Sequence, residues 1–255
     1  MERLLKNNRL REFLSVHKIK GVLFDFDDTL IFTSEIFRYY MRQFSSNLIS
    51  ECPNLNFKGF LNFLEDTNNN SYKNHAVNPK RWLNVINTIS QRLNFDGDKY
   101  KFLLHEYDKT IMQIYRTVPR IIPGAKETVY QFSCAGMQTA LITHADEVWT
   151  QFKLSATGFD NFFPPNRVFV VDQDKHKGPE DWLCAVRSMG LLPEEIIAFG
   201  DSLPGDIRAA KSIGVSVCVW LPSEWVMYND GNVPEGVITV EEGIGHAIEK
   251  LIENT

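Results

Sequence analysis

The stretch Lys20–Leu30 reads KGVLFDFDDTL, and the expected architecture of the chain can be built outward from it. Its apolar run, which ends at Phe24, is typical of a short strand that is buried on both faces. Three carboxylates follow at Asp25, Asp27 and Asp28, although buried carboxylates are rare unless they are paired or bound to metal. Open α/β sheets bind ligands at the carboxyl ends of their strands, so we predict an active site at Asp25 and Asp27. The alternative is an ordinary turn, in which Asp is also common.

The composition narrows the class of protein. The 255 residues allow one large domain or two small ones, and 44% hydrophobic with 23% charged residues is ordinary for a globular protein. The net charge of −5 gives no basic field, so we expect no nucleic-acid partner. No apolar run approaches the ~20 residues that span a bilayer, and the N-terminus lacks the apolar segment of a signal peptide. The four scattered cysteines predict no disulfide, no structural zinc and a cytoplasmic location.

Residues 1–19 have the pattern of one amphipathic helix, with basic residues between apolar ones such as Leu10, Phe13 and Leu14. A basic amphipathic helix can lie on a membrane surface. We expect instead that its apolar side packs on the domain that follows, and hence no membrane partner.

Residues 34–117 show helical periodicity and no convincing buried strand, which predicts a helical domain inserted after the first strand. Ser34 is a plausible N-cap for its first helix. Further helices are predicted around 57–64, 82–93 and 100–115, whereas the Asn-rich stretch from Asn68 to Lys80 is predicted to be a loop. Four basic residues of this segment are candidates for binding a second anionic group of a substrate: Arg38, Arg42, Lys80 and Arg81.

From Pro119 onward, strand and helix patterns alternate, which implies a parallel sheet with helices on both faces. The predicted strands are 139–143, 168–171, 196–199, 215–220 and 237–240. Helices are predicted between them, notably from Asp146, over 179–189 and over 207–213, with a last one at the C-terminus. Residues 1–33 and 118–255 are therefore predicted to form an α/β domain with a doubly wound parallel sheet, interrupted by a helical domain of residues 34–117.

Several predicted strands end in polar residues, which parallel pairing would bring to one edge of the sheet. These residues are Asp25 and Asp27, Thr143, and Asp201 with Asp206 shortly after it. The carboxylates of Asp25, Asp27 and Asp201 would repel one another unless a cation compensates them or some bind protons. Oxygen ligands without a His or Cys set suit Mg²⁺ better than zinc. The Thr143 hydroxyl and an ammonium from the cluster Lys175-His176-Lys177 would complete a phosphoryl site.

This arrangement resembles the haloacid dehalogenase (HAD) superfamily, most of whose members are Mg²⁺-dependent phosphatases. DFDDT is similar to its first motif, Thr143 to its second, Lys177 to its third and GDSLPGD to its fourth. The similar segments are Gly21–Leu30 and Pro119 to about Trp220, and the helical insert has the position of the family's C1 cap. The resemblance therefore implies a HAD-like Rossmannoid catalytic core with a helical C1-type cap.

The resemblance also implies roles for the matched carboxylates. Asp25 would be the nucleophile that forms an aspartyl-phosphate, and Asp27 the general acid and base. Mg²⁺ would be held by a side-chain oxygen of Asp25, the backbone carbonyl of Asp27 and the side chain of Asp201. Asp206 would be a further ligand or would orient one. As an alternative, Asp206 could be a helix N-cap.

Thr143 and Lys177 would bind and stabilise the transferring phosphoryl group. The lysine motif of the family commonly reads Lys-Pro-x-Pro-Asp, whereas KGPED here shifts the prolines, and register favours Lys177 over Lys175. His144 stands where many members have Asn or Gly and is a third candidate for substrate binding. Asp28 occupies a position that is often Gly.

We therefore expect a cytoplasmic, Mg²⁺-dependent phosphatase that hydrolyses a small phosphomonoester metabolite. A phosphomutase of the same superfamily, which returns the phosphoryl group to a second hydroxyl, is one alternative. A non-catalytic phospholigand-binding protein is another. A dehalogenase is disfavoured, because that branch lacks an acid at the position of Asp27. The sequence leaves the substrate and the oligomeric state open.

Overall fold

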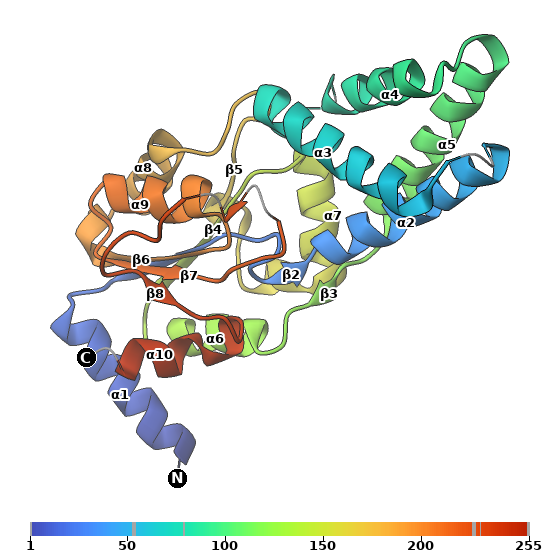
Figure 1. Cartoon of the computed structure of the whole chain (residues 1–255). Coiled ribbons are helices and arrows are strands. Elements are labelled where there is room, and N and C mark those ends of the chain that lie inside the picture. The colour runs from blue at the N-terminus through green and yellow to red at the C-terminus, as the bar shows by residue number, and fades with distance from the viewer. Residues whose placement is uncertain (1, 53–54, 79, 226–227, 230, 254–255) are drawn as a thin grey trace. The chain divides into compact units, whose positions relative to one another are not determined.

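The chain divides into two units, and the computed structural model describes residues 2–52, 55–78, 80–225, 228–229 and 231–253 (Figure 1). The sheet unit consists of Met1–Thr33, Pro119–Asp172 and Lys177–Thr255. The helical unit consists of Ser34–Val118 and Gln173–His176. The division differs from the predicted ranges at Val118 and at the short segment Gln173–His176, both of which lie with the helical unit.

The sheet unit is built on a six-stranded parallel sheet with the strand order β5-β4-β1-β6-β7-β8. Its strands are β1 (Gly21–Phe24), β4 (Gln138–Thr143), β5 (Val168–Val170), β6 (Ile196–Gly200), β7 (Val217–Trp220) and β8 (Ile238–Thr239). This order confirms the predicted doubly wound α/β sheet. The antiparallel pair β2 (Ile31–Phe32) and β3 (Arg120–Ile121) was not predicted, because two-residue strands are too short to show a periodic pattern.

β1 is buried on both faces because its side chains alternate between two apolar cores. Val22 and Phe24 point into a core that contains residues of α1, α6 and α10, whereas Leu23 points into a core with residues of α8 and α9. Figure 1 shows α8 and α9 on one side of the strands and α6 and α10 on the other. These helices are α1 (Glu2–Val16), α6 (Ala125–Cys134), α8 (Pro179–Ser188), α9 (Ala209–Ser212) and α10 (Ala247–Glu253).

The N-terminal helix α1 packs on the sheet unit, as expected. Leu10, Phe13 and Leu14 are buried in the same core as α10, which confirms packing rather than an exposed apolar face. Met1 lies outside the described residues. In the part of the chain that the structure describes, every helix is too short or too polar to cross a membrane.

In the described part of the sheet unit, the remaining elements include α7 (Glu147–Thr157) and several short helical segments. These are η1 (Phe159–Asn161), η2 (Pro165–Arg167), η3 (Pro193–Glu195), η4 (Leu203–Arg208) and η6 (Ile244–His246). η4 is a π-helical turn that leads directly into α9. The helix predicted over 207–213 therefore begins earlier, at Leu203, and its first turn has the wider π-helical hydrogen-bond spacing.

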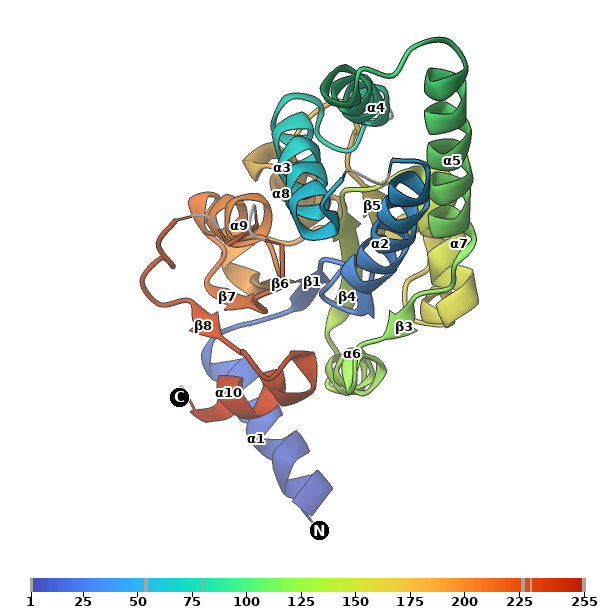
Figure 2. The ribbon, with the colours of Figure 1, turned by 45° about the vertical axis from the view of Figure 1, so that its right-hand side comes forward.

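The helical unit contains α2 (Ser34–Glu51), α3 (Phe57–His75), α4 (Lys80–Leu93) and α5 (Gly97–Arg116), which surround an apolar core of their own (Figure 2). The predicted loop from Asn68 is wrong as far as His75, because this stretch continues α3. Ser71 is buried in the helix and accepts a hydrogen bond from Asn84 of α4 at 2.9 Å. Packing of α3 against α4 therefore overrides the weak helix propensity of the asparagines.

Candidate active site

Asp25 and Asp27 follow the central strand at the carboxyl edge of the sheet. The backbone N–H of Asp25 donates to the carbonyl of Phe199 at 2.9 Å, so the pairing of β1 with β6 extends to this buried residue. Asp28 then turns the chain with φ 54°, a left-handed conformation that Asp tolerates and Gly adopts freely. This backbone geometry is compatible with Asp at this position.

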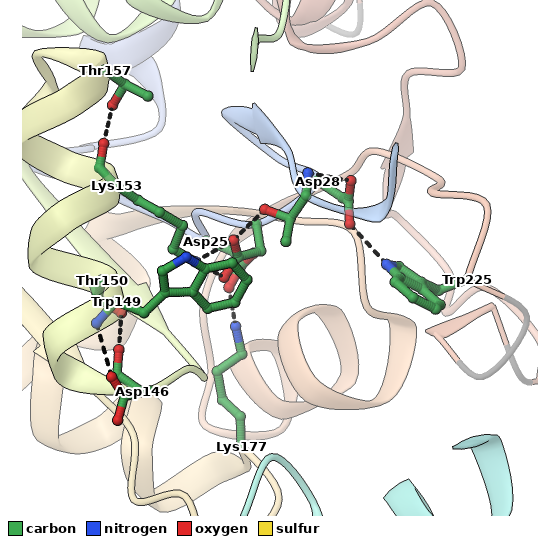
Figure 3. A network of polar contacts seen from close by, with 11 residues as sticks. Asp25, Asp28, Asp146, Trp149, Thr150, Lys153, Thr157, Lys177 and Trp225 are labelled. Carbon is green, nitrogen blue, oxygen red and sulfur yellow. Dashed lines mark hydrogen bonds and ion pairs between the residues drawn. The ribbon is translucent and has the colours of Figure 1, made fainter. Parts of the chain in front are cut away.

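The Asp28 carboxylate closes the turn and ties it to a distant loop. Its Oδ1 accepts the backbone N–H of Thr33 at 3.1 Å, and its Oδ2 accepts the indole N–H of Trp225 at 2.8 Å (Figure 3). Asp28 therefore acts as a structural link within the sheet unit.

Asp201 and Asp206 reach the same edge from the end of β6 and from η4. A Cβ atom at Gly200 would lie 2.4 Å from the Asp206 side chain, so only glycine allows the strand to pass this close to the carboxylate. Ser202 is the N-cap of η4, since its hydroxyl accepts the N–H of Gly205 at 3.1 Å. The alternative that Asp206 is the N-cap is thus wrong. Asp206 is fully buried, and its Oδ2 accepts the N–H of Ser202 at 3.0 Å.

Two indole N–H groups hold the backbone of this loop. Trp220 donates to the carbonyl of Asp201 at 2.8 Å, and the buried Trp182 donates to the carbonyl of Gly205 at 2.9 Å. One carbonyl belongs to Asp201 itself and the other to the residue before Asp206. These two bonds therefore limit how far Asp201 and η4 can shift.

Lys177, just before α8, brings the acidic residues together. Its ammonium contacts Oδ1 of Asp25 and Oδ1 of Asp206, and it lies 3.4 Å from the carbonyl of Ile142. Lys177 is almost fully buried, whereas Lys175 belongs to the helical unit. Of the two lysines considered from the sequence, Lys177 is the one in contact with Asp25.

Burial raises the pKa of each of the three clustered carboxyl groups. Burial, opposed by Lys177 and reinforced by Asp206, raises the pKa of Asp25 to about 8. Burial and then the charge of Asp25 raise the pKa of Asp201 well above its usual range, and burial raises that of Asp206 despite Lys177. Burial by itself lowers the pKa of Lys177, but the negative charges of Asp206 and Asp25 raise it by more. The net effect is a raised pKa, so the ammonium stays charged. The single positive charge of Lys177 therefore does not compensate the cost of burying three carboxyl groups in their charged form.

The carboxyl groups fit a hard divalent cation. One oxygen each of Asp25, Asp201 and Asp206 lies within 4.8 Å of the others, so a single ion could contact all three. The buried Oδ2 of Asp201 has no hydrogen-bond partner within the described residues. Oxygen ligands of this kind suit Mg²⁺. The Asp27 side chain is not part of this group, and coordination through its backbone carbonyl stays a prediction.

Thr143 and His144 stand at the end of β4, the strand beside β1. The Thr143 hydroxyl is fully buried and has no hydrogen-bond partner in the described part of the chain. A buried hydroxyl in this state has its donor available for a ligand. His144 is partly buried.

The Asp27 carboxylate has surroundings that sequence analysis did not predict. Lys153 of α7 donates to its Oδ1 at 2.5 Å and its Oδ2 at 2.7 Å, and the Thr33 hydroxyl donates to Oδ1. Figure 3 shows Lys153 extending from α7 past Trp149 toward the Asp25 region. The one sequence signal is that Lys153 shares a helix face with the buried Trp149 and Thr157, where an apolar residue is expected.

The four basic candidates in the helical unit have different surroundings. Arg38 and Arg42 line a cavity of about 610 Å³ between α2 and α5, within the helical unit. Arg81 is buried, with its guanidinium carbon 4.0 Å from the ring centroid of Trp82, and Lys80 is exposed. Arg81 is therefore engaged in packing, which leaves Arg38 and Arg42 as the better candidates for a ligand.

Comparison with known proteins adds sequence relatives to this geometry. Residues 19–214 match the family model of haloacid dehalogenase-like hydrolases. A glyceraldehyde 3-phosphate phosphatase of Pyrococcus furiosus is 25% identical over 206 residues, which cover 80% of this chain and 81% of the relative. The pyrophosphatase PpaX of Bacillus mycoides is 26% identical over 212 residues, which cover 78% of this chain and 84% of the relative.

Solved structures share the fold. A haloacid dehalogenase-like family hydrolase from Xanthomonas campestris superimposes with a TM-score of 0.68 at 20% identity, over 92% of this chain and 97% of that one.

Proposed function

Because this chain belongs to the haloacid dehalogenase-like hydrolase family, we propose that it is a phosphatase that hydrolyses small phosphomonoesters through a covalent intermediate on Asp25. The observation that carries this proposal is the buried contact of Lys177 with Asp25 beside Asp201 and Asp206. This arrangement supports the proposal, because phosphoryl transfer requires a nucleophile beside groups that stabilise negative charge, and the three carboxyl groups could hold a cation next to Lys177. The names of the relatives as phosphatases and a pyrophosphatase agree with it.

In the first step, an oxygen of Asp25 attacks phosphorus while the bond from phosphorus to the substrate alcohol breaks. Lys177 offsets the negative charge on the phosphoryl oxygens, and the Thr143 hydroxyl donates a hydrogen bond to one of them. His144, next to Thr143, would contact the same substrate. Asp27 gives its proton to the departing alkoxide, so the alcohol leaves neutral.

In the second step, Asp27 acts as a base. Its carboxylate takes a proton from the water whose oxygen attacks the aspartyl-phosphate. The bond between phosphorus and Asp25 then breaks, inorganic phosphate leaves and both aspartates return to their starting states. Asp25, Asp201 and Asp206 would hold Mg²⁺, with the backbone carbonyl of Asp27. The ion supplies positive charge at the phosphoryl oxygens.

The helical unit is proposed as the cap that contacts the variable part of the substrate, with Arg38 and Arg42 as candidates for a second anionic group. Such caps act by excluding bulk water and completing the site. The four cysteines are free thiols, which fits the reducing conditions of a cytoplasmic enzyme.

The test is a phosphate-release assay on a panel that includes glyceraldehyde 3-phosphate, pyrophosphate and sugar phosphates, with Mg²⁺ or with EDTA. We expect release from at least one phosphomonoester with Mg²⁺ and none with EDTA. Asp25→Asn should lower the rate by on the order of 10⁴-fold or more, because an amide is not a nucleophile. Circular dichroism serves as the folding control.

Each alternative has its own result in this assay. Transfer to a second sugar hydroxyl without phosphate release would identify a phosphomutase. Thermal stabilisation by a phosphorylated ligand without any turnover would identify a binding protein. Undiminished activity in EDTA would contradict the metal site, and trapped phosphate on another residue would contradict the role of Asp25.

A further inference from the structure

The side chain of Lys153 is fully buried, yet the reaction described above does not use it. Its ammonium donates to both carboxylate oxygens of Asp27, at 2.5 and 2.7 Å. The Thr33 hydroxyl donates to one of the same oxygens. These contacts approach Asp27 from two separate parts of the chain and leave its side chain 23% exposed.

Stability alone does not account for a lysine at this position. The ammonium lies over two aromatic rings, 4.1 Å from the ring centroid of Trp149 and 5.5 Å from that of Phe26, and these cation–π contacts compensate part of the cost of burying its charge. Burying a charge is costly, and a buried ion pair seldom adds net stability over an apolar contact of similar volume. The two hydrogen bonds to Asp27 are the contacts that tie this ammonium to a residue of the proposed reaction.

The helix holds the ammonium in a defined position (Figure 3). The Asp146 side chain caps α7 by accepting the N–H of Trp149 at 2.8 Å, and the hydroxyl of Thr150 donates to the Asp146 carbonyl at 2.8 Å. The Thr157 hydroxyl donates to the carbonyl of Lys153 itself at 2.6 Å. Lys153 therefore projects from a fixed backbone, which suits a group that orients another side chain.

We propose that Lys153 is a positioning residue that, together with Thr33, fixes the orientation of the Asp27 carboxylate for proton transfer. This inference rests on the proposed phosphatase function, in which Asp27 is the general acid and base. Proton transfer requires the carboxylate within hydrogen-bond reach of the reacting oxygen. A displacement of about 1 Å at a reacting group can cost up to ~10²-fold in rate.

The main variant is Lys153→Met, which keeps the length and apolar contacts of the side chain and removes the ammonium. On the best alkyl phosphate of the panel, we expect kcat to fall by roughly 10–10²-fold while KM stays near the wild-type value. On 4-nitrophenyl phosphate, whose leaving group hardly needs a proton, the fall should be smaller. The matched control is Lys126→Met, because within the described residues Lys126 lies near the ring of Phe159 and has no carboxylate partner. This control should keep the wild-type kcat.

A double-mutant cycle separates positioning from a general structural role. If Lys153 acts through Asp27, then Lys153→Met should have no further effect on kcat in an Asp27→Asn background. Multiplying losses would overturn the proposal, as would a raised KM with an unchanged kcat.

Thr33→Val provides a test that leaves Lys153 in place and stays decisive if Lys153→Met does not fold. Removing this single hydrogen bond to Asp27 should lower kcat roughly fivefold on alkyl phosphates, and an unchanged kcat overturns the proposal.

A wild-type protein without phosphatase activity would refute the proposed function. An active wild type with a fully active Lys153→Met variant would refute the positioning role alone.

Discussion

Asp25 and Asp27 are two residues apart, yet one contacts Lys177 and the other Lys153. Their substitution should therefore affect different steps. Asp27→Asn keeps the nucleophile and the group of three carboxylates, but removes both proton transfers. We expect a loss of about 10²–10⁴-fold in kcat on alkyl phosphates and a smaller loss on 4-nitrophenyl phosphate.

The measurement is the rate of the Asp27→Asn variant on both substrates, with Mg²⁺ affinity as the control. Hydrolysis of the intermediate still needs a base, so the aspartyl-phosphate should accumulate with the nitrophenyl substrate. Equal losses on both substrates together with weaker Mg²⁺ binding would make Asp27 a structural or metal-site residue instead.

The raised pKa values of Asp25, Asp201 and Asp206 set how stability depends on pH. Between the usual pKa of a carboxyl group, near 4, and the folded-state pKa of Asp25, about 8, the folded protein binds more protons than the unfolded chain. The free energy of unfolding of the metal-free protein should therefore fall as pH rises through this window. Mg²⁺ competes with these protons and should reverse the trend.

Thermal melts from pH 5 to pH 8 in EDTA and in Mg²⁺ test this prediction, with Asp25→Asn as the comparison. The variant lacks one of the three titrating groups, so its Tm in EDTA should depend less on pH. A wild-type Tm in EDTA that rises over this range relative to the variant would contradict the sign.

At the scale of elements, the junction of β6 and η4 is the tightest part of the site. In Gly200→Ala, the added Cβ would displace the Asp206 side chain, which is 2.4 Å from its position. We expect a loss of about 1–3 kcal/mol in stability, typical of overpacking, and weaker Mg²⁺ binding. The control Gly59→Ala, in α3, meets no atom closer than 3.5 Å and should keep both properties. Metal titration and chemical denaturation of both variants are the measurements, and unchanged Mg²⁺ affinity in Gly200→Ala would contradict the prediction.

Strongly patterned elements could be predicted from the sequence, whereas contacts between distant elements could not. β1, β4 and β6 are close to their predicted ranges, because continuous apolar runs ending in acidic or hydroxyl residues leave few alternatives. The second half of α3 was missed because the burial of Ser71 depends on α4. The contact of Lys153 with Asp27 was missed for the same reason, since no local pattern pairs a residue in the turn after β1 with one on α7.

At the scale of the whole molecule, the sequence indicates two units because the pattern changes from strand to helix after Leu30 and back after Pro119. The exception is Gln173–His176, which lies with the helical unit although it is far from α2–α5 in sequence. The Asn78 side chain donates to the Asp174 carboxylate, and this tertiary contact has no local signature.

The position of the insertion has a consequence for the order of folding. Gly21 of β1 pairs with Gln138 and with Ile196. The central strand can therefore form its sheet contacts only with segments that lie more than a hundred residues further along the chain. The helices α2–α5 instead find their partners among themselves, within residues 34–116. High contact order slows folding, so α2–α5 should gain structure first and β1 among the last.

Pulsed hydrogen exchange during refolding of the full chain would follow this order. Amides of α2–α5 should become protected before those of β1, and simultaneous protection of both would contradict the expectation. On the ribosome, the same delay would leave the apolar run Val22–Phe24 without β4 until residue 138 is made and without β6 until residue 196 is made. The nascent chain should then depend on chaperones or low temperature to avoid aggregation.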